Sequence, residues 1–223
     1  SIAVSSSVSS EDMNSIVELI KKNNPELFWI SYDSVSVSTV NGRSTWIFPV
    51  YSAFRSDGKL DTAAIKKVQE SLSATVKAVG RRENDYETAK AINGYLASNV
   101  KYSYDCGNYN VYEVTGSLAG SSSACEGFAK GFKYLCDQLG VNCIVVSGKG
   151  ILNGRTYDHA WNYVQLDGKW YLVDSTWNSL GSGTEKWFLL GANSTVGGLT
   201  LLRSHAPYTP SDYPTLSEAD YAA

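Results

Sequence analysis

The stretch "HAWNYVQLDGKWYLVDSTW", residues 159–177, contains the strongest local fold signal in the chain. Two segments rich in β-branched and aromatic residues flank Asp167-Gly168, a dipeptide typical of a two-residue β-turn. In such a hairpin Leu166 faces Lys169, so every opposed pair has residue numbers that sum to the same value. The sequence therefore predicts an antiparallel hairpin with a fixed register.

This register makes a prediction about titratable side chains. It places His159 opposite Thr176 and Trp161 opposite Asp174. Because strand side chains alternate between faces, all four are expected on one face of the sheet. His159 and Asp174 become diagonal neighbours, so the carboxylate can fix the tautomer of the ring and stabilise an imidazolium.

Cys125 is the candidate partner for this pair. It follows three serines, which can cap a helix, and it stands in the first turn of the helical segment "CEGFAKGFKYLCDQLG", where the helix dipole favours a thiolate. Gly127 permits a close backbone approach, and the Cys125 amide can donate to an oxyanion. The pattern indicates a nucleophilic cysteine.

Structural interpretations remain open for these residue types. A cysteine at a helix start is commonly a small buried residue, and a strand histidine facing a carboxylate is commonly part of the core. We assign Cys136 and Cys143 to the core. Cys106, in the polar loop "DCGNYN", either pairs with another thiol or stays free, and His205, with no visible carboxylate partner, is assigned a structural role.

Composition excludes several classes of function. The chain has 223 residues, 43% of them hydrophobic and 18% charged, with a net charge of -3. No basic field is available for nucleic acid, so we expect no nucleic-acid partner. The apolar runs are far shorter than the roughly 20 residues that cross a bilayer, so we expect no membrane insertion.

The first residues and the cysteine content bear on location. Because the chain opens on Ser rather than Met, we expect it to be a fragment of a longer protein. The Ser-rich lead over residues 1–10 resembles a linker, and we expect an extracellular or cell-surface bacterial protein. Four scattered cysteines are too few for a disulfide framework. No zinc-ligand spacing or cofactor motif is visible, so we predict no metal and no cofactor.

The first half reads as scaffold. Patterns of apolar residues and caps predict a helix from Ser10 to Pro25, a hairpin around Asn41-Gly42, a helix capped by Asp61 and a helix capped near Asn84 or Asp85. "SLAGSSSA" reads as a flexible loop. We expect a single domain over 11–223, with an N-terminal helix and hairpin extension over about 11–80 and a core over about 84–206.

Several of these segments together resemble a known family. "ACEGFAKGFKYLCDQLGVNCIVVSG" followed by "DHAWNYVQLDGKWYLVDSTWN" resembles the bacterial branch of the transglutaminase-like superfamily. "AINGYLASNVKYSY" and "EKWFLLGANSTVGGLTLLRSHAPY" are similar to further parts of the family core. The resemblance implies an α+β, papain-like fold in which the helix bearing the Cys packs on an antiparallel sheet bearing His and Asp.

The resemblance also implies roles. Cys125 would be the nucleophile, His159 the general base and acid, and Asp174 the residue that orients the ring, the same three that spacing selects. Tyr102 or Tyr104 would supply a second oxyanion donor. Trp161, Glu126 and Trp177 are candidates for lining the substrate cleft. The chain departs from the commoner pattern at Asn93, where relatives often have His or Arg, and at Asn178, where they often have Asp.

Two classes of function follow. The first is thiol-dependent acyl transfer on a peptide amide, which gives a cysteine protease or amidase if water is the acceptor and a transglutaminase if an amine is. A protein or peptide substrate, associated with the cell wall, is the expected partner. The second is a non-catalytic binding or scaffold module of a bacterial surface protein. Neither the substrate nor the oligomeric state follows from the sequence.

Overall fold

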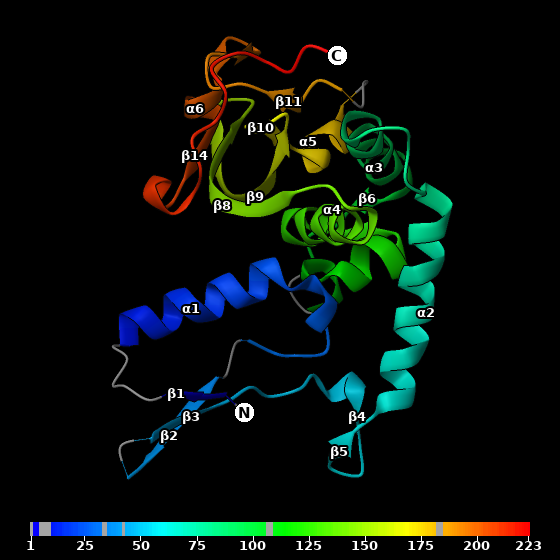
Figure 1. Ribbon diagram of the computed structural model, residues 1–223, viewed down its shortest axis with the longest axis vertical. Helices are drawn as coiled ribbons and strands as arrows, with labels where there is room; N and C mark the ends of the chain where they lie inside the picture. Colours follow the sequence, from blue (N-terminus) through cyan, green and yellow to red (C-terminus); the bar gives the residue numbers. More distant parts are fainter. Residues whose placement is uncertain (1, 5–9, 33–34, 42, 106–108, 182–184) are drawn as a thin grey trace. The chain divides into compact units, whose positions relative to one another are not determined.

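The chain forms two compact units, Ser1–Glu70 and Ser71–Ala223, where the sequence suggested one domain over 11–223. A computed structural model describes residues 2–4, 10–32, 35–41, 43–105, 109–181 and 185–223, and Figure 1 shows its helices and strands. Cys106 lies outside the described residues, so its predicted alternatives stay open. Within the described ranges no helix is long and apolar enough to cross a bilayer.

The first unit contains the expected helix and hairpin. Helix α1 (Ser10–Asn23) is followed by strands β2 (Ser36–Val40) and β3 (Arg43–Ile47), and β3 also pairs with β1 (Ile2–Val4). Val17, Tyr32 and Trp46 form its buried cluster. The remaining elements are η1 (Pro25–Leu27), η2 (Ser52–Phe54), β4 (Arg55–Ser56) and β5 (Lys59–Leu60).

Two helices begin where their capping residues predict. Helix α2 (Thr62–Val79) starts after Asp61, whose Oδ1 accepts from Ala64 N at 2.9 Å, and runs across the boundary between the units. Helix α3 (Asp85–Asn99) starts after Asn84, whose side chain accepts from Glu87 N at 2.8 Å. Each cap satisfies one of the amide groups that a helix start leaves without a partner.

A five-stranded antiparallel sheet dominates the second unit. Its order is β11-β10-β9-β8-β14. Strand β8 pairs with β9 along its whole length, from Cys143 opposite Val164 to Leu152 opposite Arg155. The strand bounds are β8 (Cys143–Leu152), β9 (Arg155–Leu166), β10 (Lys169–Val173), β11 (Phe188–Leu190) and β14 (His205–Pro207).

The predicted hairpin register is confirmed as far as β10 extends. Strands β9 and β10 pair from Leu166 opposite Lys169 to Asn162 opposite Val173. Beyond that point the prediction is wrong, because the chain turns into helix α5 (Ser175–Leu180) with Asp174 as its N-cap. Thr176 therefore lies in a helix and not opposite His159.

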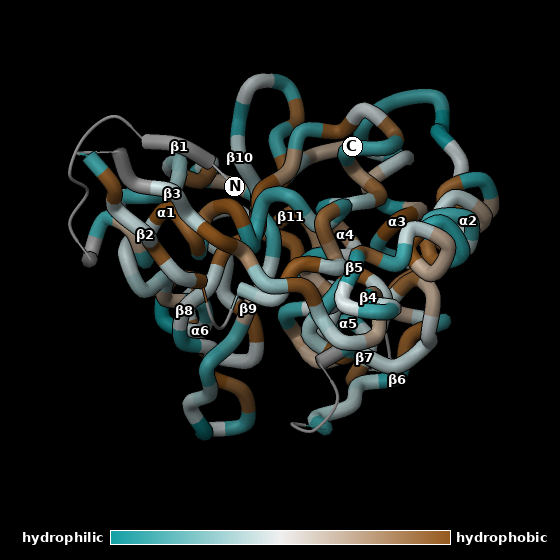
Figure 2. The backbone as a smooth tube through the Cα atoms, turned by 90° about the horizontal axis from the view of Figure 1, so that it is seen from below, coloured by the Kyte–Doolittle hydropathy of each residue, from teal (hydrophilic) through white to brown (hydrophobic). Residues whose placement is uncertain are grey.

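Helix α4 (Cys125–Leu139) covers one face of this sheet and ends at Gly140, which has the expected left-handed conformation, φ 75°. Ala129 on the helix packs with Val145 and Ala160 on the sheet, and Asn162 Nδ2 donates to Ala129 O at 3.0 Å. In Figure 2 stretches of α3 and α4 are brown, hence hydrophobic, whereas the visible part of α2 is largely teal. The structure is thus the expected α+β arrangement.

The opposite face of the sheet holds a large aromatic cluster. Trp161 and Tyr163 of β9 pack there with Trp177 and Trp187. Short elements cover this side: α6 (Leu201–Ser204), β12 (Thr195–Val196), β13 (Leu199–Thr200) and η5 (Pro210–Asp212). Since side chains alternate along β9, His159 shares this face with Trp161.

The segment before α4 is more ordered than its composition suggested. The predicted loop "SLAGSSSA", residues 117–124, overlaps a π-helical turn, η4 (Thr115–Gly120), and contains a strand, β7 (Ser122–Ser123). β7 pairs in parallel with β6 (Lys101–Tyr102), and η3 (Tyr109–Tyr112) lies between them in sequence. The loop prediction was wrong because small polar residues here bond to backbone groups, as Ser117 Oγ does to Gly127 O at 2.8 Å.

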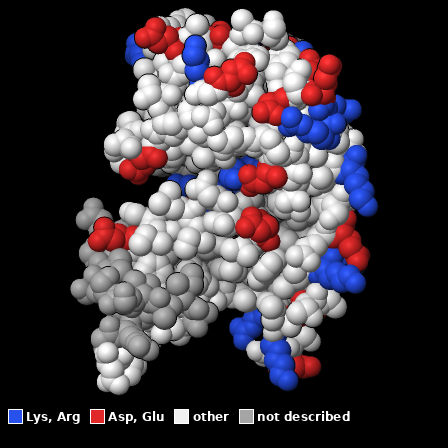
Figure 3. All heavy atoms as spheres, viewed as in Figure 1, with Lys and Arg blue, Asp and Glu red and all other residues white. Residues whose placement is uncertain are grey.

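The face in Figure 3 carries mixed charge. Basic and acidic residues alternate on it, and the described residues show no broad patch of one sign there. This distribution agrees with the net charge of -3.

Candidate active site

Cys125 is the first residue of α4 and is partly exposed, with a free thiol. The serines before it do not cap the helix as expected: the N-cap position is Ala124, without a side-chain cap, and Ser123 Oγ donates to Val111 O at 3.0 Å. The partial positive charge of the helix start is therefore not met by a capping side chain. A thiolate or an oxyanion at this position would benefit from it.

Gly127 permits the close approach that its position predicted. A Cβ added there would lie 2.2 Å from Ser123 Oγ and 2.5 Å from Val111 O. These distances are too short for any side chain. The first turn of α4 is thus held directly against the backbone of the preceding segment.

His159 lies on β9 with 7% of its surface exposed. Its Nε2 is 2.7 Å from Asp174 Oδ2, and its ring stacks on Trp177 with centroids 4.8 Å apart and planes 13° apart. Nδ1 remains the ring nitrogen available to the Cys125 side chain, with which His159 also interacts. The structure thus brings the three predicted residues together.

Electrostatics favour a charged His159–Asp174 pair. Burial lowers the pKa of His159, but Asp174, and after it Cys125, outweigh burial and raise this pKa to about 10. Burial raises the pKa of Asp174, but His159 and His205 outweigh it, so the net shift is downward. The ring holds its proton and the carboxylate stays ionised at neutral pH.

Asp174 also begins a helix. Its Oδ1 accepts from Trp177 N at 3.0 Å, which makes it the N-cap of α5. Asp174 is fully buried, at 0% exposure. Because one oxygen is fixed by the helix, the other is held toward the histidine rings.

His205 corrects an expectation. It was assigned a structural role for lack of a carboxylate, yet its Nε2 is 3.1 Å from Asp174 Oδ2. Strand β14 brings it there by pairing His205 with Gly150 of β8. The contact was missed because the two residues are 31 positions apart and the pairing of β14 leaves no local sequence signal.

A cavity of about 640 Å³ opens beside Cys125 and His159. Tyr102, Tyr104 and Trp177, all predicted near the site, line it. Burial, followed by Cys125, raises the pKa of Tyr102, so its hydroxyl keeps the proton that an oxyanion donor needs. Other lining residues are Leu152, Asn153, Thr156, Tyr157, Asp158, Thr176 and Leu180.

Two predicted cleft residues lie elsewhere. Neither Glu126 nor Trp161 is among the described residues that line this cavity. Glu126 forms an ion pair with Lys130, 3.0 Å away, and Lys130 is fully buried and also pairs with Glu113 at 2.8 Å. Trp161 is 1% exposed and belongs to the core. Adjacency in sequence was misleading because the helix turn carries Glu126 away from the thiol.

Asn93 and Asn178, the two departures from the family pattern, contact each other. Asn93 Oδ1 accepts from Asn178 Nδ2 at 3.1 Å and from Ser175 Oγ at 2.9 Å. Asn178 Oδ1 in turn accepts from Trp187 N at 2.8 Å. Both side chains are buried. A neutral amide pair thus links α3 to α5, the helix that Asp174 caps.

The two remaining described cysteines lie in the core, away from the cavity. Cys136 and Cys143 are buried with free thiols, as expected of core residues. The side chains of His159, Asp174 and His205 converge, with one heteroatom from each within 4.8 Å of the others, and they use these atoms to hydrogen-bond with one another. That the chain needs no metal stays a prediction.

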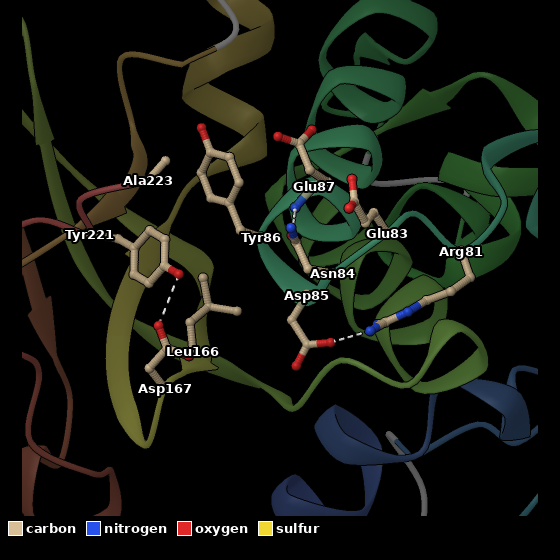
Figure 4. A pocket seen from close by; sticks show the side chains of 10 residues that line it. All are labelled: Arg81, Glu83, Asn84, Asp85, Tyr86, Glu87, Leu166, Asp167, Tyr221 and Ala223. Carbon is tan, nitrogen blue, oxygen red and sulfur yellow. Dashed lines mark hydrogen bonds and ion pairs between the residues drawn. The ribbon is translucent and has the colours of Figure 1, made fainter.

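A second cavity, about 600 Å³, lies at the start of α3 (Figure 4). Two pairs of its lining residues contact each other: Arg81 pairs with Asp85, and Tyr221 Oη donates to Asp167 Oδ2 at 2.9 Å. Tyr86 stacks on Tyr221 with centroids 5.5 Å apart. This second cavity is not lined by Cys125, His159 or Asp174.

Comparison with known proteins shows what the core is similar to. Residues 73–175 match the model of the transglutaminase-like superfamily. Kyphoscoliosis peptidase of Mus musculus is 31% identical over 134 residues, and that of Homo sapiens is 33% identical over 106 residues. These matches cover 54% and 43% of this chain but only 20% and 16% of the relatives, so the chain spans about a fifth of their length or less.

Solved structures include similar chains as well. The crystal structure of a TGase matches 96% of this chain and 56% of its own, with 16% identity and a TM-score of 0.47. The match at residues 73–175 covers α3, all of α4 and the strands β8, β9 and β10, and it ends one residue after Asp174. Through these residues the chain is similar to the transglutaminase-like superfamily.

Proposed function

We propose that this protein catalyses thiol-dependent acyl transfer on peptide amides, with Cys125 as nucleophile, His159 as general base and acid, and Asp174 as the residue that orients the ring. One observation carries the proposal: the His159 ring bonds Asp174 at 2.7 Å through Nε2 and interacts with Cys125 at the wall of a cavity. A purely structural histidine would not need a thiol beside it on a cavity wall.

The reaction follows from these positions. The Cys125 thiolate attacks the amide carbonyl, and the protonated His159 then transfers its proton to the leaving amine as the C–N bond breaks. The acyl group is left as a thioester on Cys125. An acceptor, water or an amine, loses its proton to His159, attacks the thioester and releases the thiolate. Asp174 steadies the ring in both half-reactions.

Two groups are suited to stabilise the oxyanion. The backbone amide of Cys125 lies at the start of α4, where the helix dipole is positive. Tyr102 lines the same cavity and lies on β6, which β7 holds beside the start of α4. We assign the second donor to Tyr102 rather than Tyr104, because Tyr104 is more exposed, 69% against 42%.

The acceptor decides between two activities. We favour water, hence hydrolysis of peptides, and the names of the two peptidase relatives support this choice. We place the substrate among cell-wall-associated peptides outside a bacterial cell. Incubation with glutamine- and lysine-containing peptides would test the choice by mass spectrometry. Hydrolysis adds the mass of one water, whereas crosslinked products would show that an amine is the acceptor.

Alkylation tests the catalytic assignment without a known substrate. If Cys125 forms an ion pair with His159, iodoacetamide modifies it at mildly acidic pH, before the buried Cys136 and Cys143. His159→Gln should abolish this early labelling, and Cys125→Ala should abolish turnover with the fold intact. Cys136→Ala serves as the control that retains both. Slow labelling of all thiols in the wild type would favour a non-catalytic binding module.

A further inference from the structure

His205 is the one histidine that the proposed mechanism does not use, yet it contacts the same carboxylate as His159. Its Nε2 is 3.1 Å from Asp174 Oδ2, and its Nδ1 is 3.0 Å from Ser204 Oγ. The ring is 1% exposed. Both ring nitrogens therefore have polar partners in a site closed to water.

Three tryptophans surround the ring. Its centroid lies 4.3 Å from that of Trp177, 5.0 Å from that of Trp161 and 5.1 Å from that of Trp187. The same Trp177 stacks on His159. An apolar enclosure of this kind opposes a second positive charge next to His159, and burial accordingly lowers the pKa of His205. The ring is neutral where His159 is charged.

A neutral imidazole has one N–H, so its tautomer matters. The ionised Asp174 can only accept, which requires the proton of His205 on Nε2. Nδ1 must then accept, and the adjacent Ser204 hydroxyl can donate to it. Ser204 Oγ also lies 3.0 Å from Leu201 O, which competes with Nδ1 for the single hydroxyl proton. When the hydroxyl points to Nδ1, Ser204 stabilises the tautomer that bonds Asp174.

Asp174 then receives three donors. Trp177 N donates to Oδ1, while His159 and His205 both donate to Oδ2. A buried carboxylate needs such donors to remain ionised without solvent. The second ring also prevents the carboxylate from rotating away from His159. Removing it would leave His159 as the only side-chain donor to Oδ2 among the described contacts.

We propose that His205, oriented by Ser204, is a positioning residue that keeps Asp174 ionised and aimed at His159. This role rests on the proposed function, because it acts only through the Cys125–His159 pair. His205 does not touch the cavity that Cys125 lines. It would act on reactivity, and binding of the substrate would be unaffected.

The experiment measures how fast iodoacetamide modifies Cys125 across a range of pH, with the modified peptide identified by mass. His205→Leu removes the donor, His205→Gln keeps an N–H group near the position of Nε2, and Ser204→Ala leaves the ring but removes its partner. Trp187→Phe is the matched control, since it alters the same enclosure without removing a donor to Asp174. Thermal unfolding is recorded for every variant.

We expect His205→Leu to slow alkylation at about pH 6 roughly tenfold or more, the effect of losing a hydrogen bond to a charged group. The rate at high pH, where the thiol is ionised without help, should stay the same. Ser204→Ala should move the profile in the same direction by less, and His205→Gln should restore part of it. Trp187→Phe should lower the unfolding temperature and leave the profile unchanged.

Two other outcomes are distinguishable. If wild-type Cys125 reacts early but His205→Leu and Ser204→Ala share its profile, His205 is only structural and the proposed function stands. If wild-type Cys125 reacts only as an ordinary thiol does, with a midpoint near about pH 8.5, both the proposed function and this role are overturned. Should His205→Leu fail to fold, Ser204→Ala and His205→Gln still decide between these outcomes.

Discussion

Asp174 performs two tasks with its two oxygens. Oδ1 caps α5 through Trp177 N, and Oδ2 receives the two histidine rings. The capping bond restricts the rotation of the carboxylate about its side-chain bonds. Asp174 therefore couples local folding to reactivity. The direction in which Oδ2 points toward His159 depends on the bond by which Oδ1 caps α5.

Asp174→Asn should separate these tasks. The amide oxygen can still cap α5, but its NH₂ group then faces the histidine rings and forces His159 into the wrong tautomer. We expect a turnover loss of about 10⁴-fold, as in other triads, with the fold retained. Peptide turnover and circular dichroism would check both parts. Asp167→Asn, in the exposed turn between β9 and β10, is the control that should keep full activity.

His159 also makes stability depend on pH. In the folded protein it holds its proton up to a pKa of about 10, whereas in the unfolded chain it releases the proton near about 6.5. Its stabilising contribution is therefore complete below about pH 6.5 and is lost as the pH rises toward 10. Urea unfolding should show wild-type stability falling over this window.

The variant His159→Gln isolates this contribution, since it retains every other titrating group. Its free energy of unfolding should fall less steeply than that of the wild type between about pH 7 and pH 10. Parallel curves for the two proteins would contradict a charged His159–Asp174 pair. The lowered pKa of His205 has the opposite sign, because its neutral form stabilises the fold above about pH 6.5 and protonation opposes folding below it.

At the residue scale, the sequence was sufficient to select Cys125, His159 and Asp174 as candidates, but not to predict which side chains surround them. Cys125, His159 and Asp174 were accessible because each follows a local signal: a helix start, a strand pattern or a turn. His205 depends on a strand pairing that no local pattern encodes. Glu126 was placed in the cleft although a helix rotates successive residues by about 100°, which carries it toward the buried Lys130.

At the scale of elements, the spacing between β8 and the site depends on Gly150, which has no side chain. Gly150 lies between His205 on one neighbouring strand and Tyr157 on the other. A Cβ added at Gly150 would lie 2.9 Å from Trp177 Cζ2 and 3.0 Å from His159 Cβ. The glycine therefore leaves room for the stacked pair of His159 and Trp177.

Gly150→Ala should push this stacked pair away from β8. We expect a loss of stability of about 1–3 kcal/mol from overpacking, together with slower alkylation of Cys125 at mildly acidic pH. Gly94→Ala is the control, since an added Cβ there meets no atom within 4 Å. In that helix the exchange should be neutral or stabilising by up to about 1 kcal/mol. Equal effects of both variants would contradict the steric argument.

Most helices and strands could be predicted from the sequence. The predictions that were wrong concern residues whose structure depends on more than the local pattern. Helix caps at Asp61 and Asn84 and the register up to Val173 follow from local rules. The predicted register was wrong from Asp174 onward, because the prediction extended the strand to a residue that instead caps helix α5. The prediction of a flexible loop was wrong at the π-helical turn over Thr115–Gly120, because tertiary contacts order this segment and its composition does not reveal them.

For the whole molecule, the division into two units separates scaffold from site. The clusters around Trp161 and around Ala129 lie in Ser71–Ala223, as do Cys125, His159, Asp174 and His205. The cluster of Val17, Tyr32 and Trp46 lies in the first unit. Each unit thus has its own buried residues, and the proposed chemistry belongs to the second.

Truncation tests whether the second unit is sufficient. A chain of residues 62–223 retains all of α2, which Thr75 Oγ1 ties to Leu118 O at 3.0 Å. Because every described contact of the site lies within this range, we expect it to fold and to show the wild-type pH profile of Cys125 alkylation. A chain of residues 71–223 starts inside α2, loses about the first two and a half turns of this helix and should unfold at a lower temperature. If residues 62–223 fold but Cys125 reacts like an ordinary thiol, the first unit contributes to the site.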